Sequence, residues 1–180
     1  MSREDQKPGP VALITGGAQR VGAQIVRTLH AAGFNVVIHY GTSQQQAIAL
    51  QDELVAYRPR SVSIIQADLL SPGAADTLIA HVSKVWQRLD VLVNNASTFY
   101  PTRIGTITEA QWVDLFGTNV KAPLFLAQAA APLLRHHGGS IVNITDIHAE
   151  RSLKYHSVYC MAKAALIHLT KSLAKALGPE

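Results

Sequence analysis

The chain has 180 residues, of which 48% are hydrophobic and 16% are charged, so it has the size and composition of one folded domain rather than of a disordered chain. It lacks an apolar stretch of the ~18 residues that a membrane span needs, and its first ten residues lack the apolar core of a signal peptide, so we expect a single domain over residues 1–180 in the cytoplasm. The net charge of +4 comes without a basic cluster, which disfavours nucleic acid as a partner, and the single Cys160 excludes a disulfide framework.

Short apolar segments alternate with longer helical patterns along the chain. The apolar segments are nearly continuous in hydrophobic residues, which predicts strands buried on both faces of a parallel sheet. We expect these strands at residues 11–15, 35–39, 61–66, 90–93 and 140–145.

Helical patterns fill the segments between these strands. A helix over 20–32 ends at Gly33, a second covers 43–57, and a third covers 72–87 with Ser71 as its N-cap and Pro72 in its first turn. The segment 109–137 is interrupted by Pro123 and Pro132, which predicts two helices or one broken helix. A last helix spans about 157–177.

Alternation of strands and helices after a glycine-rich turn predicts an α/β Rossmann-like, doubly wound parallel sheet of strand order 3-2-1-4-5. The last helix should lead into a sixth strand, yet the sequence stops at Gly178-Pro179-Glu180. The strand at 140–145 would then be an uncovered apolar edge. We expect that C-terminal strands are missing from this chain; coverage of that edge by a partner chain is the alternative.

The first strand is followed by the turn Thr15-Gly16-Gly17-Ala18-Gln19-Arg20-Val21-Gly22 and then by a helix. Glycine allows a sharp turn and a close approach of a ligand, and a helix N-terminus favours a pyrophosphate. A charged arginine within the turn could be aimed at the pyrophosphate or at a substrate beside it, or could simply be solvated. We expect cofactor contacts from Gly16, Gly17, Arg20, Val21 and Gly22.

The second strand ends at His39-Tyr40-Gly41-Thr42-Ser43, with none of the carboxylates that would bind the ribose hydroxyls of NAD. NADP is therefore preferred, with contacts from His39, Tyr40 and Ser43. Asp68 and Leu69 follow the third strand, where Asp68 could bind adenine or cap a loop. Asn95 and Ala96, after the fourth strand, could line the cofactor cleft or form a turn.

Tyr159 and Lys163 are four residues apart, so they share one face of the last helix. A lysine ammonium near a phenol lowers the pKa of the phenol from ~10 toward neutral, which suits general acid–base chemistry. An exposed helix face is the alternative for this pair. Asn119 precedes Pro123 by four residues, so its carbonyl has no helical N–H partner and could hold a water beside a site.

Together these motifs resemble the short-chain dehydrogenase/reductase family along essentially the whole chain. Within that family the chain is most similar to the pteridine reductases, on Arg20 in the glycine turn and on the stretch Asn94-Asn95-Ala96-Ser97-Thr98-Phe99-Tyr100-Pro101. Most members place a catalytic serine after the fifth strand. This chain has Asp146 there, thirteen residues before Tyr159, as the pteridine reductases do.

The resemblance implies an NADPH-dependent reduction of a dihydropterin to the tetrahydropterin. Tyr159 would donate a proton, Lys163 would tune it and hold the nicotinamide ribose, and Asp146 would relay a proton to the pterin if desolvation raises the pKa of its carboxyl. The resemblance also implies that Phe99 stacks on the pterin, with core packing as the alternative. It implies a hydrogen bond from Ser97 to the pterin or a cofactor phosphate, and a substrate contact from Arg20. Finally, it implies a 2′-phosphate contact from Ser43 and a proton relay through Asn119.

The resemblance further implies a homotetramer, with the helices near 109–137 and 157–177 at an interface. Tyr40-Gly41-Thr42 departs from the histidine–arginine pair of some pteridine reductases. The alternatives are a general short-chain carbonyl reductase and a nucleotide-binding module without activity. No set of side chains has the spacing of a metal site.

Overall fold

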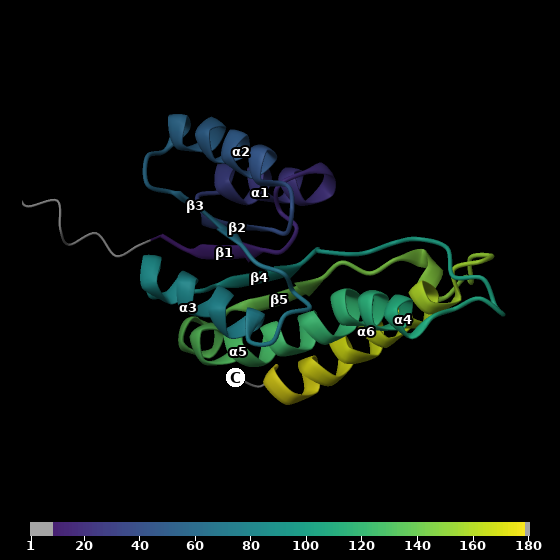
Figure 1. Ribbon diagram of the computed structural model, residues 1–180. Helices are drawn as coiled ribbons and strands as arrows, with labels where there is room; N and C mark the ends of the chain where they lie inside the picture. The colour runs from purple at the N-terminus through teal and green to yellow at the C-terminus, as the bar shows by residue number, and fades with distance from the viewer. Residues whose placement is uncertain (1–8, 179–180) are drawn as a thin grey trace, which may run out of the picture.

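A computed structural model describes residues 9–178, which form one five-stranded parallel sheet with helices on both faces (Figure 1). The strand order β3-β2-β1-β4-β5 confirms the predicted topology, and all four pairings are parallel. The predicted strands differ from the observed ones by one or two residues at their ends. The strands are β1 (Val11–Ile14), β2 (Asn35–Tyr40), β3 (Val62–Gln66), β4 (Val91–Asn94) and β5 (Ser140–Asn143).

Two helices pack on one face of the sheet, α1 (Arg20–Ala31) and α2 (Gln44–Tyr57), whereas α3 (Ala74–Trp86) and α5 (Ala122–His137) cover the other (Figure 1). The remaining segments are α4 (Glu109–Phe116), the π-helical turn η1 (Gly117–Lys121), the short 3-10 helix η2 (Ile147–Ala149) and α6 (Ser157–Leu177). Helix α6 contacts α4, η1 and η2, which brings the segments after β4 and β5 together.

Alternate side chains of β1 pack into two hydrophobic cores, one on each face of the sheet. Ala12 and Ile14 of β1 point into the core beneath α1 and α2, whereas Val11 and Leu13 point into the core beneath α3 and α5. All four are fully buried. Burial of a leucine or isoleucine side chain contributes roughly 2 kcal/mol, so these central strands hold the ends from which the functional loops leave the sheet.

The prediction of strands buried on both faces holds for β1 and is wrong for the outer strands β3 and β5. Ser140 and Val142 of β5 are exposed, and only Val62 of β3 is buried. An outer strand has a neighbouring strand on one edge only, which leaves more of its surface exposed. β5 borders a groove lined by Ile141 and Leu173, among other residues.

Two predicted helix signals are wrong in detail. Helix α3 begins at Ala74 after Gly73, whose φ of 77° is left-handed, and not at the Ser71-Pro72 cap. The Ser71 hydroxyl instead donates to Asp68 Oδ2 at 3.0 Å, which removes it from the helix end. Pro132 lies inside α5 without ending it.

The break in the segment 109–137 occurs at the other proline. Pro123 lies in the first turn of α5, where its missing N–H costs little. The preceding turn η1 widens to a π-helix, in which the Ala122 N–H bonds to the carbonyl of Gly117. This widening relieves the clash between a proline ring and the carbonyl four residues earlier, that of Asn119, and π-turns of this kind are frequent at functional sites.

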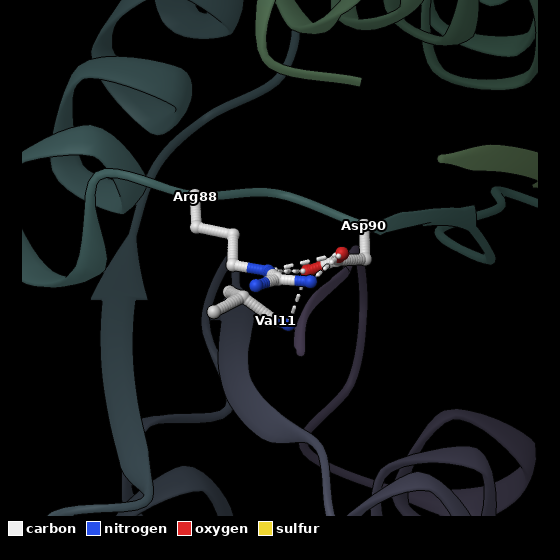
Figure 2. Close-up of polar contacts among 3 residues, drawn as sticks. All are labelled: Val11, Arg88 and Asp90. Carbon is white, nitrogen blue, oxygen red and sulfur yellow. Dashed lines mark hydrogen bonds and ion pairs between the residues drawn. The ribbon is translucent and has the colours of Figure 1, made fainter. Parts of the chain in front are cut away.

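A partly buried ion pair holds the start of the central strands β1 and β4 (Figure 2). The Asp90 carboxylate accepts the Val11 N–H at 2.7 Å and is held by Arg88 through hydrogen bonds of 2.8 to 3.0 Å. The Asp90 N–H in turn donates to the Val11 carbonyl. Burial raises the pKa of the Asp90 carboxyl, but the Arg88 and Val11 hydrogen bonds outweigh burial, so its pKa lies below the ordinary value.

No helix in residues 9–178 is long and apolar enough to cross a membrane. The single-domain boundary at 1–180 and the cytoplasmic location stay predictions. Part of the first ten residues, on which the location depends, lies outside the described residues.

We predict that Asp90→Asn lowers the free energy of unfolding by about 1 to 2 kcal/mol at pH 7, because it removes the charge that Arg88 and the Val11 N–H stabilise. A depressed carboxyl pKa contributes stability above the ordinary pKa near 3.8 and loses it as the pH falls through the lower folded value. The gap between wild type and variant should therefore shrink below about pH 4 in urea unfolding. Asp52→Asn, at an exposed position of α2, is the matched control; an equal effect of both variants would contradict this role.

Candidate active site

A cleft of about 870 Å³ opens at the carboxyl ends of the strands, around the end of β1. This is the position at which an open α/β sheet binds its ligand. Most of the predicted cofactor residues line it: Gly16, Arg20, Val21, Gly22, His39, Tyr40, Ser43, Asp68, Leu69, Asn95, Ala96 and Ser97. Gly17 and Lys163 are not among the lining residues. Gly17 packs inward, where a Cβ would meet Ile38.

The glycine turn is compact because its backbone conformations and contacts exclude larger side chains. Gly16 has a φ of 59°. A Cβ on Gly22 would collide with the Gly16 carbonyl and lie 2.6 Å from Asn95 Nδ2. No side chain caps the first turn of α1, so its N–H groups are available to an anion in the cleft.

Arg20, at the start of α1, has a left-handed φ of 51°, a conformation that glycine adopts more readily than other residues. Its side chain is exposed at the cleft, and none of the described residues accepts a hydrogen bond from it. A cation is therefore held beside the uncapped helix end, as the interpretation of Arg20 as an anion ligand requires.

The loop after β4 is tied to the glycine turn. Asn95 Nδ2 donates to the carbonyls of Thr15 at 2.9 Å and Gly16 at 3.0 Å. The Thr15 hydroxyl accepts the backbone N–H groups of Asn95 and Ala96, both at 3.0 Å. Asn95 thus fixes the two loops that form opposite sides of the cleft.

His39 lines the cleft but its ring is used for structure. It is 2% exposed, its Nδ1 accepts the Gly16 N–H at 3.2 Å, and its Nε2–H therefore donates to the Ala67 carbonyl at 3.0 Å. Burial lowers the pKa of the imidazole, so the ring is neutral at pH 7. With both ring nitrogens engaged, His39 braces the glycine turn rather than offering a charge to a phosphate.

Asp68 and Ser43, at the same end of the cleft, differ in whether their side chains already make hydrogen bonds. Asp68 accepts the Leu70 N–H and the Ser71 hydroxyl, both at 3.0 Å, so the loop-capping interpretation describes it in this structure. Ser43 lies at the N-cap position of α2, yet its side chain makes no capping hydrogen bond. Its hydroxyl therefore remains available at the cleft.

The side chains predicted to be catalytic do not line this cleft, but they meet next to Ser97, which does. The Tyr159 hydroxyl of α6 donates to Asp146 Oδ2 at 2.6 Å, and the other Asp146 oxygen accepts the His148 N–H at 2.9 Å at the start of η2. Asp146 therefore both caps a turn and holds the phenol. Lys163, one turn along α6, is 3% exposed and donates from Nζ to the Ile144 carbonyl at 3.0 Å.

The predicted directions of the pKa shifts of Tyr159 and Asp146 are wrong for the free chain. Burial and the hydrogen bond to Asp146 raise the pKa of Tyr159 above its ordinary value, rather than lowering it toward neutral. Burial raises the pKa of Asp146, but the hydrogen bonds from His148 and Tyr159 outweigh burial and leave it lowered. The reason is orientation: the phenol donates a hydrogen bond to a carboxylate, and the Lys163 ammonium donates to a carbonyl. Burial also lowers the pKa of Lys163.

These features coincide with a match to a family model described as short chain dehydrogenase, over residues 10–180. The chain belongs to the short-chain dehydrogenase family. It is 38% identical to pteridine reductase 1 of Leishmania tarentolae, over 94% of this chain and 72% of that protein. It is also 32% identical to an uncharacterized oxidoreductase of Bacillus subtilis, over 94% and 69%, and 32% identical to a 3-oxoacyl-(acyl-carrier-protein) reductase of Staphylococcus aureus, over 93% and 68%.

As a short-chain dehydrogenase the protein is an oxidoreductase, and the family uses a nicotinamide dinucleotide. The cleft fits such a cofactor on three observations: its volume, the uncapped first turn of α1, and the close approach that Gly22 permits. No group of three or more His, Cys, Asp or Glu side chains in the described part of the chain could hold a metal ion.

Asn119 of this short-chain dehydrogenase makes contacts that the sequence argument missed. Its side chain is buried and donates to the carbonyls of Leu115 at 2.9 Å and Thr98 at 3.1 Å. Its Oδ1 accepts the Ser97 hydroxyl at 2.6 Å. The sequence pointed to the Asn119 backbone carbonyl through Pro123, but the side chain is what ties η1 to the loop after β4.

Phe99 does not pack in the core, because 55% of its surface is exposed. Its ring stacks on His156, with centroids 4.7 Å apart and planes 10° from parallel, and meets the edge of Tyr159 at 4.8 Å. The contact with His156 was not predicted. The signal was present, because His156 precedes Tyr159 by three residues and therefore lies on the same side of the helix start.

We predict that Gly22→Ala lowers the free energy of unfolding by about 1 to 3 kcal/mol and weakens nicotinamide dinucleotide binding, because the added methyl displaces the Gly16 carbonyl and Asn95. Thermal unfolding and calorimetric titration measure the two effects. Gly41→Ala is the control for stability, since a Cβ there meets nothing within 4 Å. Equal stability of the two variants would show that the turn tolerates a side chain at Gly22.

Proposed function

We propose that this short-chain dehydrogenase is an NADPH-dependent reductase of a pterin, taking a dihydropterin to its tetrahydro form. One observation carries the proposal: the Tyr159 hydroxyl is hydrogen-bonded to the Asp146 carboxylate at 2.6 Å, beside the exposed ring of Phe99. The flat Phe99 ring thus contacts Tyr159, which is one of the two groups that would transfer protons.

The chemistry of a ring imine explains why a carboxyl group is useful here. Reduction of such a bond adds a hydride to carbon and a proton to nitrogen, so an acid must lie within hydrogen-bond reach of the nitrogen. Short-chain reductases that this chain otherwise resembles place a serine where it has Asp146. A serine hydroxyl suits the oxygen of a carbonyl substrate, whereas a carboxyl group can itself supply a proton.

When bound, NADPH would supply the hydride. Burial and Asp146 raise the pKa of the Tyr159 hydroxyl, so it keeps its proton. It donates that proton in a hydrogen bond to Asp146. A flat substrate over this pair would exclude water from the Asp146 carboxyl and favour its protonated form. The Asp146 carboxyl could then pass a proton to the substrate nitrogen and take the proton of the Tyr159 hydroxyl, which would be replaced from solvent.

Lys163 and Asn119 would support this proton transfer. The Lys163 ammonium is buried 5.7 Å from the centre of the Tyr159 ring, close enough to stabilise negative charge that develops there. We assign it the nicotinamide ribose as well. Ser97, held by Asn119, would contact the pterin or a cofactor phosphate. The Asn119 carbonyl, which the Pro123 ring leaves without a helical donor, would hold a water in the relay to solvent.

NADPH is proposed over NADH because the residues that follow β2 include no carboxylate to repel a 2′-phosphate. The Ser43 hydroxyl and the Arg20 guanidinium both line the cleft. The ratio of kcat/KM for the two cofactors tests this preference.

A homotetramer is part of the proposal. Trp112 and Val113 of α4, Phe125 of α5 and Met161 of α6 are each at least 41% exposed, which is unusual for large apolar side chains and suits a contact between copies. The native mass in solution tests it.

The alternative is a reductase of carbonyl substrates, which the similarity to the Staphylococcus aureus protein favours. A second alternative is a nucleotide-binding module without activity. Turnover separates the three: a carbonyl substrate reduced without any pterin turnover supports the first, and cofactor binding without any turnover supports the second.

We predict NADPH oxidation on addition of a dihydropterin, followed by absorbance, and a fall in kcat of about 100-fold in both Tyr159→Phe and Asp146→Asn, since each removes a proton-transferring group. The exposed Asp52→Asn is the control. Full activity of Asp146→Asn would exclude a role of this carboxyl in proton transfer.

A further inference from the structure

Three side chains at the outer end of the site form a positively charged cluster. The Arg103 guanidinium lies 3.9 Å from the centre of the Tyr155 ring, and the Lys154 ammonium lies 4.9 Å from the same point. All three side chains are exposed. Cations lie over aromatic faces because the ring quadrupole attracts them, so Tyr155 gathers two like charges in one place.

This cluster is joined to the candidate active site by short contacts. The Thr102 N–H donates to the Tyr155 carbonyl at 2.5 Å, and Thr102 and His156 form a parallel bridge. His156, the next residue along, stacks on Phe99. The cluster is therefore separated by one ring from the side chain that we propose stacks on the substrate.

The two cations have no counter-charge in the described part of the chain. In residues 9–178 the ion pairs are Arg27–Glu53 and Arg88–Asp90, so no described carboxylate pairs with Arg103 or Lys154. Tyr155 has a left-handed φ of 66°, which is unfavourable for a bulky residue. Both cations are exposed and lack a carboxylate partner among the described residues, so they are available to an anionic ligand.

We propose that Arg103, Lys154 and Tyr155 form a subsite for a carboxylate-bearing tail on the substrate, so that the enzyme favours pterins with an anionic aromatic tail over pterins with a short uncharged one. This inference rests on the proposed pterin reductase function. The flat head of the substrate would lie against Phe99, and its tail would run past His156 to the two cations. Arg103 suits a carboxylate because its guanidinium can donate two parallel hydrogen bonds, and the exposed Tyr155 ring offers an apolar surface.

The test compares dihydrofolate, whose tail carries carboxylates, with dihydrobiopterin, whose side chain is uncharged. The readout is the ratio of kcat/KM for the two substrates in the full chain, measured with saturating NADPH. We expect the double variant Arg103→Ala/Lys154→Ala to lower this ratio about tenfold, mainly through KM for dihydrofolate. The matched control is Lys84→Ala/Lys175→Ala, which removes two exposed cations elsewhere and should leave the ratio unchanged. High salt should lower the ratio of the wild type and not that of the Arg103/Lys154 variant.

The outcomes separate the two levels of the proposal. An unchanged ratio in the Arg103/Lys154 variant, or the same fall in the control, would overturn the tail subsite and leave the pterin reductase intact. A wild type that reduces neither pterin would overturn both.

Discussion

The hydrogen bond between the Tyr159 hydroxyl and the Asp146 carboxylate determines what the rest of the site can do. It joins α6 to the segment after β5, and its 2.6 Å length is that of a charge-assisted bond. Burial and the hydrogen bond to this carboxylate raise the pKa of the phenol, so Tyr159 is protonated in the free protein. The proton is thus in place before any substrate arrives, as the proposed role of the pair in proton donation requires.

The scaffold holds this pair beside a rigid cleft. Asn95 and Thr15 tie the loop after β4 to the glycine turn, and Asn119 ties that loop to the π-turn η1. At the amino ends of the strands, Asp90 fixes the first residue of β1 (Figure 2). Side chains held by several hydrogen bonds need no reorganisation when a ligand binds, which is the condition for efficient transfer of a proton over a short distance.

The sequence was sufficient for the topology and for placing Tyr159 near Asp146, and it was insufficient for the electrostatics of the site. Strand order follows from alternation and from the handedness of crossovers, which are local properties. The direction of a pKa shift depends on where a side chain points: Lys163 faces the Ile144 carbonyl, and Tyr159 faces Asp146. The stack of Phe99 on His156 was missed because the spacing of His156 and Tyr159 places His156 near the site, whereas nothing in the sequence shows where the exposed Phe99 ring points.

The ionisation of Tyr159 tests the central claim most directly, and nuclear magnetic resonance of isotope-labelled tyrosine can follow it, with Tyr159→Phe assigning the signal. The account predicts a pKa above the ordinary value of about 10 in the free protein, and a lower pKa in Asp146→Asn, where the carboxylate no longer opposes ionisation. A pKa near neutral that does not respond to Asp146→Asn would contradict it, and would show that Lys163 rather than Asp146 controls the phenol.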